Sequence, residues 1–268
     1  MNKTKIDWCE STWNPVTGCY HNCEYCYAAK IAKRFEGYDF YQKQAPRSIM
    51  EIENNLHRVE KDRPFYKENV NTGKKYVAPY PFGFEPTFRE DKLDEYVNKK
   101  GRAIFVCSMS DLFGDWVPDE WILEVFEACK KAPQHTYLFL TKNPKRYLEL
   151  GKKDLLPKAD NMWYGTTITH PEDPYFFSKN HNTFLSIEPI LEDFTGEYLN
   201  FNKACTKWVI LGAETGNQKN KVVPKKEWID FISSCCEKEG VPLFMKESIL
   251  PIVGGENFVQ EYPWKTEK

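Results

Sequence analysis

Three cysteines within eight residues are the part of this sequence best suited to chemistry. Cys19, Cys23 and Cys26 have the spacing C-x3-C-x2-C. They follow a Pro- and Gly-containing loop, Asn14–Gly18, and precede a helix that we expect to run to about Phe35. Three thiolates on one short loop can each bind a different iron of a [4Fe–4S] cluster, which leaves the fourth iron without a protein ligand. Such an open iron is a site for chemistry.

A zinc site is the alternative interpretation of this loop. Structural zinc takes four protein ligands, usually from two C-x2-C-type knuckles, so Cys9 or His21 would have to supply the fourth ligand. Because the sequence has no second knuckle, the spacing favours a cluster, and we expect Cys9 to be a loop or core thiol. The spacing of the remaining cysteines does not indicate a second cluster; they are Cys107, Cys129, Cys205, Cys235 and Cys236.

Composition limits the class of protein and its partners. With 268 residues, 41% of them hydrophobic, the chain can bury one large core in a single α/β domain. A formal charge of −2 gives no global attraction to nucleic acid or to anionic membranes, so any basic binding surface must be local. The sequence shows neither a targeting segment nor a run of roughly 18 to 20 apolar residues. We therefore expect a cytoplasmic protein without a membrane partner.

Six apolar, β-rich runs from about residue 100 onward predict a parallel sheet. The runs hardly alternate between polar and apolar residues, as expected for strands covered on both faces. Helices are predicted at Pro118–Ala132 and Pro224–Glu239, because Pro opens each and Gly240 follows the second. The predicted strands are Ala103–Ser108, Thr136–Thr141, Met162–Thr167, Thr183–Glu188, Lys207–Gly212 and Val241–Lys246.

Repeated βα units of this kind wind into a barrel or an open doubly wound sheet. We assign the cluster loop to residues 14–36, an insertion to residues 37–88, the βα units to about residues 100–250, and a tail to residues 251–268. Within the insertion, residues 51–75 are expected to cover one face or the mouth of a barrel. A further helix is predicted at Arg89–Lys100.

The three-cysteine loop resembles the motif of the radical S-adenosylmethionine (SAM) superfamily, C-x3-C-x-aromatic-C, with Tyr25 at the aromatic position. Beyond the loop, the sequence resembles an uncharacterised, often phage-encoded three-cysteine family related to these enzymes. More distantly, it is similar to spore photoproduct lyase, which repairs thymine dimers in DNA. The matching segments are Trp13–Cys19, Ser108–Phe113, Leu140–Pro144, Leu185–Pro189 and Gly212–Gly216.

The resemblance implies a fold and a chemistry. The fold is a partial (β/α)6 TIM-type barrel of radical-SAM type, in one domain with an N-terminal insertion. SAM chelates the open iron through its amino and carboxylate groups, and an external electron donor supplies the electron that cleaves the sulfonium. The products are methionine and a 5′-deoxyadenosyl radical, which removes a hydrogen atom from the substrate.

Polar residues at the ends of the predicted strands complete the candidate site, because ligands bind at the carboxyl ends of strands in α/β sheets and barrels. The superfamily's G-G-E element is absent, and the resemblance places Ser110 and Asp111, with Ser108 close by, at the SAM amino group. The other assignments are Tyr25 beside the cofactor, Lys142 for the SAM carboxylate, Thr166 and Thr167 for the ribose, Glu188 for a ribose hydroxyl or substrate, and Glu214 as a ligand-binding residue between glycines.

Two basic stretches bear on the substrate. Residues 142–158 and 219–226 can form a positive rim for phosphates, with Trp163, Tyr164 and the aromatic residues of 65–88 available for base stacking. Solvated surface charge is the alternative. The resulting hypothesis is a radical-SAM enzyme that acts on a nucleotide or a nucleic-acid base. Other hypotheses are a radical-SAM enzyme acting on a small molecule or peptide, and a non-catalytic iron–sulfur or zinc protein that binds a partner.

Overall fold

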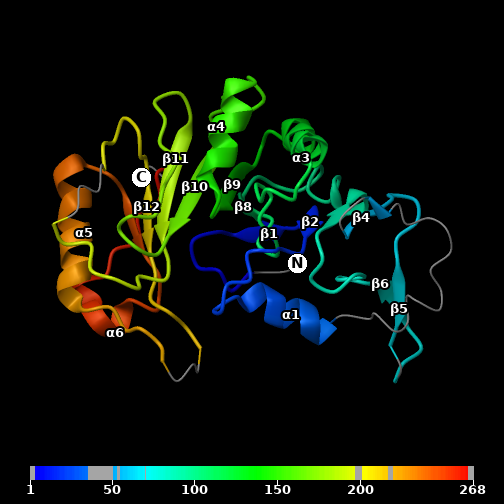
Figure 1. Ribbon diagram of the computed structural model, residues 1–268, viewed down its shortest axis with the longest axis horizontal. Coiled ribbons are helices and arrows are strands. Elements are labelled where there is room, and N and C mark those ends of the chain that lie inside the picture. The colour runs from blue at the N-terminus through cyan, green and yellow to red at the C-terminus, as the bar shows by residue number, and fades with distance from the viewer. Residues whose placement is uncertain are drawn as a thin grey trace. The chain divides into compact units, whose positions relative to one another are not determined.

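The computed structural model describes residues 4–35, 51–52, 55–69, 71–196, 201–216 and 220–264, with only the backbone described at 51–52. The chain divides into two compact units (Figure 1). We call Ser11–His135 the cysteine unit, and Met1–Glu10 together with Thr136–Lys268 the sheet unit. Each unit is described separately below.

The sheet unit is built on five parallel strands that follow one another in chain order. Almost all residues of these strands are buried, and the short apolar strands β12 and β13 are buried throughout. Parallel strands covered on both faces require such continuous apolar runs. The strands are β9 (Thr136–Thr141), β10 (Met162–Ile168), β11 (Asn182–Ile187), β12 (Val209–Leu211) and β13 (Leu243–Met245).

Three α-helices of the sheet unit lie in its described part: α4 (Pro144–Lys152), α5 (Lys226–Glu239) and α6 (Leu250–Val253). A short 3₁₀ helix, η2 (Gly255–Asn257), follows them. The inner face of α5 buries Ile229 and Ile232 in the same apolar core as residues of β11, β12 and β13. Gly240 ends α5 in the left-handed conformation, with φ of 62°, which glycine adopts without a steric penalty.

The cysteine unit contains one parallel strand pair and two smaller sheets; the parallel pair continues the strand order of the seven-stranded sheet that includes β9 to β13. β1 (Ser11–Trp13) pairs in parallel with β8 (Ala103–Val106). A four-stranded sheet has the order β2 (Val16–Thr17), β7 (Thr87–Arg89), β4 (Leu56–Val59) and β3 (Glu51–Ile52). β5 (Tyr66–Glu68) and β6 (Lys75–Val77) form an antiparallel pair. The α-helices are α1 (Tyr27–Phe35) and α3 (Asp119–Lys131).

The α/β class and all six predicted strands are confirmed, as are the helices following Pro118 and Pro224, to within two residues at each end. The (β/α)6 repeat is less regular than predicted, because the described residues 169–181 between β10 and β11 form bends and loops without a helix. Residues 37–50, 53–54 and 70 of the predicted insertion lie outside the described residues. No helix in the described part of the chain is long and apolar enough to cross a membrane.

The predicted helix at Arg89–Lys100 is wrong. Only η1 (Glu90–Lys92), a single 3₁₀ turn, forms there, and turns follow it. Local backbone bonds there reach the third residue back, as from the Glu95 amide to the Lys92 carbonyl at 3.1 Å, which is a turn pattern rather than an α-helical one. The Lys92 carbonyl also accepts a hydrogen bond from the indole nitrogen of Trp13 at 2.8 Å. Tyr96 donates its hydroxyl to the Thr12 carbonyl at 2.9 Å, so long-range contacts tie these turns to β1.

Candidate functional site

The cysteine loop leaves β2 through Gly18, where only glycine fits. Its φ is +87°, and a Cβ atom would lie 2.2 Å from the backbone oxygen of Glu85. The Gly18 amide donates to the Met109 carbonyl at 2.9 Å, which ties the start of the loop to the segment after β8. The adjoining Cys19 amide donates to the Phe84 carbonyl at 3.1 Å. The backbone before the first thiol is thus held on two sides.

The other two cysteines lie where the loop turns into α1. The Cys26 amide donates to the Cys23 carbonyl at 3.0 Å, which closes a tight turn between these two residues. The Ala29 amide, in the first turn of α1, donates to Cys26 Sγ at 3.3 Å. Sulfur can therefore take the place of an N-cap oxygen at the start of this helix. All three loop thiols belong to partly exposed residues.

Two serines predicted as SAM ligands hold the cysteine loop in the structure. Asn14 Oδ1 accepts a hydrogen bond from the Met109 amide at 3.0 Å and lies 3.2 Å from Ser108 Oγ, which donates to it. Ser110 Oγ donates to the Gly18 carbonyl at 2.6 Å. The segment after β8 therefore holds the loop through side chains at both of these points. Asn14 belongs to the motif before the first cysteine, but its role was not predicted from the sequence.

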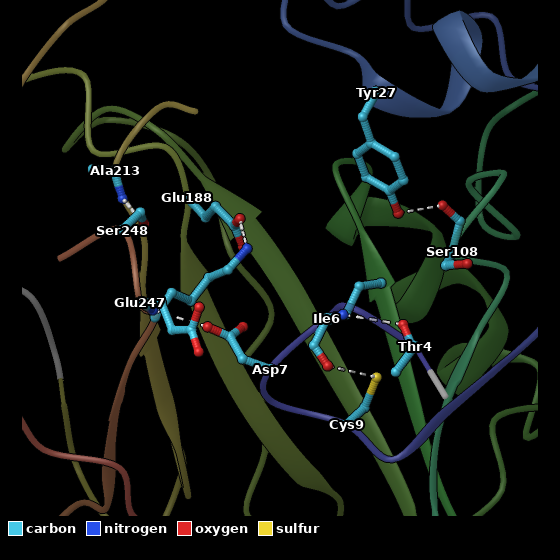
Figure 2. A network of polar contacts seen from close by, with 11 residues as sticks. Thr4, Ile6, Asp7, Cys9, Tyr27, Ser108, Glu188, Ala213, Glu247 and Ser248 are labelled. Carbon is cyan, nitrogen blue, oxygen red and sulfur yellow. Dashed lines mark hydrogen bonds and ion pairs between the residues drawn. The ribbon is translucent and has the colours of Figure 1, made fainter. Parts of the chain in front are cut away.

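Tyr27 forms a third link between the loop and this segment. Its hydroxyl donates to the Ser108 carbonyl at 2.7 Å, as Figure 2 shows. Because Tyr27 directly follows Cys26 in the chain, this bond fixes the backbone beside the third thiol.

Both carboxylate oxygens of Asp111 contact other residues of the protein. Its side chain is 7% exposed and forms an ion pair with His21, with 2.7 Å between Oδ2 and Nε2. Oδ1 accepts a hydrogen bond from the Phe113 amide at 2.9 Å. The His21 ring meets the Trp116 ring edge-on, with 4.9 Å between centroids. His21 was considered only as a zinc ligand from the sequence, whereas here it anchors the middle of the loop.

Charge and burial act together on the first thiol. Burial raises the pKa of Cys19 to about 12, and the negative charges of Asp111, Cys23 and Cys26 add to this increase, while a backbone hydrogen bond at His21 opposes it. A bound cation would favour the thiolate that burial disfavours.

The donor set of the loop fits an iron–sulfur cluster in its chemistry. Thiolates are the usual ligands of such clusters, and the three partly exposed cysteines lie on one loop. Within the described residues, no group of three or more His, Cys, Asp or Glu side chains is arranged to hold a metal ion. Cys9, the alternative zinc ligand, is buried as predicted, and its thiol donates to the Ile6 carbonyl at 3.9 Å.

The sheet unit gathers a second polar cluster at the carboxyl ends of three adjacent strands. Glu188 follows β11, Gly212 follows β12 and Lys246 follows β13, and the Lys246 ammonium forms an ion pair with the Glu188 carboxylate (Figure 2). A Cβ on Gly212 would lie 2.9 Å from Glu188 Cγ and 3.0 Å from Lys246 Cδ. Glycine at this position therefore leaves room for the ion pair. The role of Lys246 as the partner of Glu188 was not predicted.

Neighbouring side chains of this strand end have backbone partners. Glu214 accepts a hydrogen bond from the Val222 amide at 3.0 Å, and Ser248 accepts one from the Ala213 amide at 3.0 Å. The Glu247 amide donates to Asp7 at 2.9 Å.

The two threonines of β10 differ in accessibility. Thr166 is fully buried, and its hydroxyl accepts a hydrogen bond from the Phe176 amide at 3.1 Å, so it is not positioned for a ribose. Thr167 is partly exposed, as is Lys142, which follows β9. Tyr25 is partly exposed within the cysteine loop.

Two of the residues expected to stack on bases are covered. Tyr164 is fully buried, and Trp163 is 7% exposed and packs against Trp264 with 5.5 Å between ring centroids. Both lie in β10, a strand covered on both faces, whereas Tyr66 and Tyr76 of the 65–88 segment are exposed, so base stacking by that segment stays a prediction. In the basic stretches, four cations have acidic partners nearby: Lys145 and Arg146 with Glu149, Lys158 with Asp154, and Lys226 with Asp230. Lys219 lies outside the described residues.

Comparison with known proteins gives one finding. The model of a family described as a protein of unknown function, DUF5131, matches residues 3–249, which span both compact units. No curated protein and no solved structure matches the chain.

Proposed function

Since the chain belongs to the DUF5131 family, whose description gives no activity, we propose from its own residues that it is a radical-SAM enzyme. Cys19, Cys23 and Cys26 would hold a [4Fe–4S] cluster, and SAM would bind the open iron. The observation that carries this proposal is the C-x3-C-x2-C spacing of three partly exposed cysteines on a loop held from several sides.

The chemistry that such a cluster supplies is one-electron reduction of bound SAM, which yields methionine and a hydrogen-abstracting 5′-deoxyadenosyl radical. The protein contributes position. Ser110 and Asn14 hold the segment before the first thiol, and Asp111 holds the middle of the loop through His21. Their bonds support a role in fixing the spacing of the thiols, rather than the contact with the SAM amino group that the sequence suggested for Ser110 and Asp111.

The polar strand ends of the sheet unit stay predicted ligand-binding positions. Lys142, Thr167, Glu188 and Glu214 are partly exposed polar residues at or near strand ends, which is where α/β proteins bind ligands. Glu188 is held by Lys246, so a ligand hydroxyl would meet a fixed carboxylate. A nucleotide or nucleic-acid base stays a predicted substrate, although the burial of Trp163 and Tyr164 removes part of its support.

Anaerobic reconstitution with iron and sulfide tests the proposal. After reduction with dithionite, the wild-type protein should cleave SAM to 5′-deoxyadenosine, measured by chromatography. Cys19→Ala, Cys23→Ala and Cys26→Ala should each lose the cluster absorbance and this product, because each removes one of three iron ligands. Cys9→Ala is the matched control. Cys9 is also a cysteine near the N-terminus, but it is buried and is not part of the C-x3-C-x2-C motif.

The control should retain both the absorbance and the product. A wild-type protein that assembles and reduces the cluster but leaves SAM intact would exclude this activity. Loss of the cluster in Cys9→Ala would instead show that the ligand assignment is wrong.

A further inference from the structure

The helix that begins at the third cysteine exposes an unusual face. α1 packs inward through its small residues Ala28 and Ala32, which are buried. Tyr27 and Phe35 are each 48% exposed and Ile31 is 37% exposed. Because these three residues are spaced by four, they form one stripe along the helix. Large apolar side chains gathered in this way, rather than scattered singly, indicate an interaction surface.

Positive charge flanks this stripe. Lys30, Lys33 and Arg34 are exposed, and α1 contains no acidic residue. No ion pair of these three cations occurs among the residues that the structure describes. The whole chain carries a formal charge of −2, so the cations of α1 are a local exception. An apolar centre with a charged rim is the usual anatomy of a protein–protein interface, and a cationic rim is complementary to an acidic partner.

The position of α1 indicates what this partner delivers. The helix begins at the residue after Cys26, and the Ala29 amide donates to Cys26 Sγ. Its exposed face is therefore joined to a proposed cluster ligand by one peptide bond and one hydrogen bond. Cleavage of SAM requires one electron per turnover, and the chain itself supplies no source for it. A partner docked on α1 would lie beside the most direct covalent route to the cluster.

We propose that the exposed face of α1, formed by Tyr27, Lys30, Ile31, Lys33, Arg34 and Phe35, is the docking surface for an acidic one-electron carrier protein. This inference rests on the proposed function. One electron leaves the carrier and enters the cluster, which passes from the 2+ to the 1+ state, and no atom or bond is exchanged between the proteins. The nine-residue helix is about 14 Å long, which suits the small interfaces of transient redox complexes.

A nucleic acid is the other polyanion that a cationic face attracts. Protein–nucleic acid interfaces are more polar and more densely charged than protein–protein interfaces. The aliphatic side chain of Ile31 at the centre of the stripe, between two aromatic residues one turn away on either side, favours a protein partner.

The test uses the full-length reconstituted protein and a recombinant flavodoxin as the carrier. Binding of the flavodoxin is measured by titration calorimetry, and cluster reduction is followed by stopped-flow absorbance with either reduced flavodoxin or dithionite. The test variant is Lys30→Glu/Lys33→Glu/Arg34→Glu, and Phe35→Ser probes the apolar stripe without a change of charge. The matched control reverses three exposed lysines elsewhere, as Lys100→Glu/Lys203→Glu/Lys238→Glu.

We expect the α1 triple variant to slow reduction by flavodoxin by about tenfold or more, because both attraction and docking are lost. Phe35→Ser should weaken flavodoxin binding, and reduction by dithionite should be unchanged in both variants. The control triple should differ from the wild type by about twofold or less, since none of its three lysines belongs to α1. Raising the salt concentration should slow the wild-type reaction with flavodoxin toward the rate of the α1 variant.

The inference would be overturned if flavodoxin reduced the α1 triple variant at the wild-type rate. It would also be overturned if reduction by dithionite slowed as much as reduction by flavodoxin. A variant that loses binding to a single-stranded oligonucleotide but keeps binding to flavodoxin would overturn it as well, since the face would then serve nucleic acid. If dithionite-reduced wild type forms no 5′-deoxyadenosine, the proposed function fails, while flavodoxin binding and reduction rates still decide whether α1 is the docking face.

Discussion

At the scale of single residues, the cysteine loop depends on Gly18, a position where the surrounding backbone leaves no room for a side chain. Gly18 has a left-handed backbone and no space for a Cβ atom, whereas Gly151 in α4 has no atom within 4 Å of that position. The two glycines therefore separate the effect of steric fit from the general effect of adding a methyl group. They form a matched pair for mutation.

Gly18→Ala should lower the free energy of unfolding by at least about 1–2 kcal/mol, which is the cost of a left-handed residue with a side chain, and it should impair iron loading. Gly151→Ala should be neutral or should stabilise the protein by roughly 0.5–1 kcal/mol, because alanine is the better helix former. Urea denaturation and iron analysis of both variants check this. A Gly18→Ala protein with wild-type stability and iron content would show that the loop tolerates a different path.

The sequence located the candidate residues, but it did not predict how they are held. The cysteine spacing identified the loop, and the strand-end positions identified Glu188. It could not show that Asp111 is taken by His21, since these residues are 90 positions apart. A short motif reports residue types, whereas the choice among possible hydrogen-bond partners is made by the folded chain.

At the scale of elements, apolar runs predicted the strands well because the strands are buried on both faces. Burial on both faces of β10 also covers Trp163 and Tyr164, which the sequence suggested as residues for base stacking. The Arg89–Lys100 segment forms turns instead of a helix, and Trp13, 79 residues away, bonds the carbonyl of Lys92. Local periodicity cannot report a bond of that range.

Burial by these elements also determines thiol reactivity. Desolvation raises the pKa of Cys107, after β8, and of Cys129, in α3, and it raises the pKa of Cys236, in α5, to about 12. A raised pKa leaves less thiolate at a given pH, and the thiolate is the nucleophile. At pH 8 in the native, cluster-free protein, iodoacetamide should therefore leave these three cysteines unmodified.

Mass spectrometry of the labelled protein measures this pattern. The partly exposed Cys23 and Cys26 should be modified first, and labelling in denaturant, where burial is lost, should reach every cysteine. Rapid native labelling of Cys107 or Cys129 would contradict the packing described here. The order should hold until the pH approaches the raised pKa values of the buried thiols.

At the scale of the whole molecule, the chain is not divided in simple sequence order. The first ten residues belong with residues 136–268, and the cysteine unit lies between them in the sequence. Trp8, which is 2% exposed, is the main anchor of the N-terminal segment. Its ring lies 6.4 Å from that of Phe184 and 6.3 Å from that of Trp208, centroid to centroid. This discontinuity had no signal in the composition.

Trp8→Ala should lower the free energy of unfolding by about 3–5 kcal/mol, because it removes a large side chain from a packed aromatic cluster. Phe177→Ala is the control, since Phe177 is 56% exposed and an exposed substitution usually changes stability by within about 0.5 kcal/mol. Thermal and urea unfolding of the two variants make the comparison. Equal stability of both would mean that the N-terminal segment does not anchor the sheet unit.

The central claim is that three cysteines leave one iron of a cluster open to SAM. Electron paramagnetic resonance of the reconstituted, dithionite-reduced protein tests this most directly, with SAM added to one of two identical samples. We predict a [4Fe–4S]⁺ signal that changes in shape and g values when SAM is present, in the wild type and in Cys9→Ala alike. A signal indifferent to SAM, or a protein that retains one zinc ion with four side-chain ligands at the loop, would contradict the account.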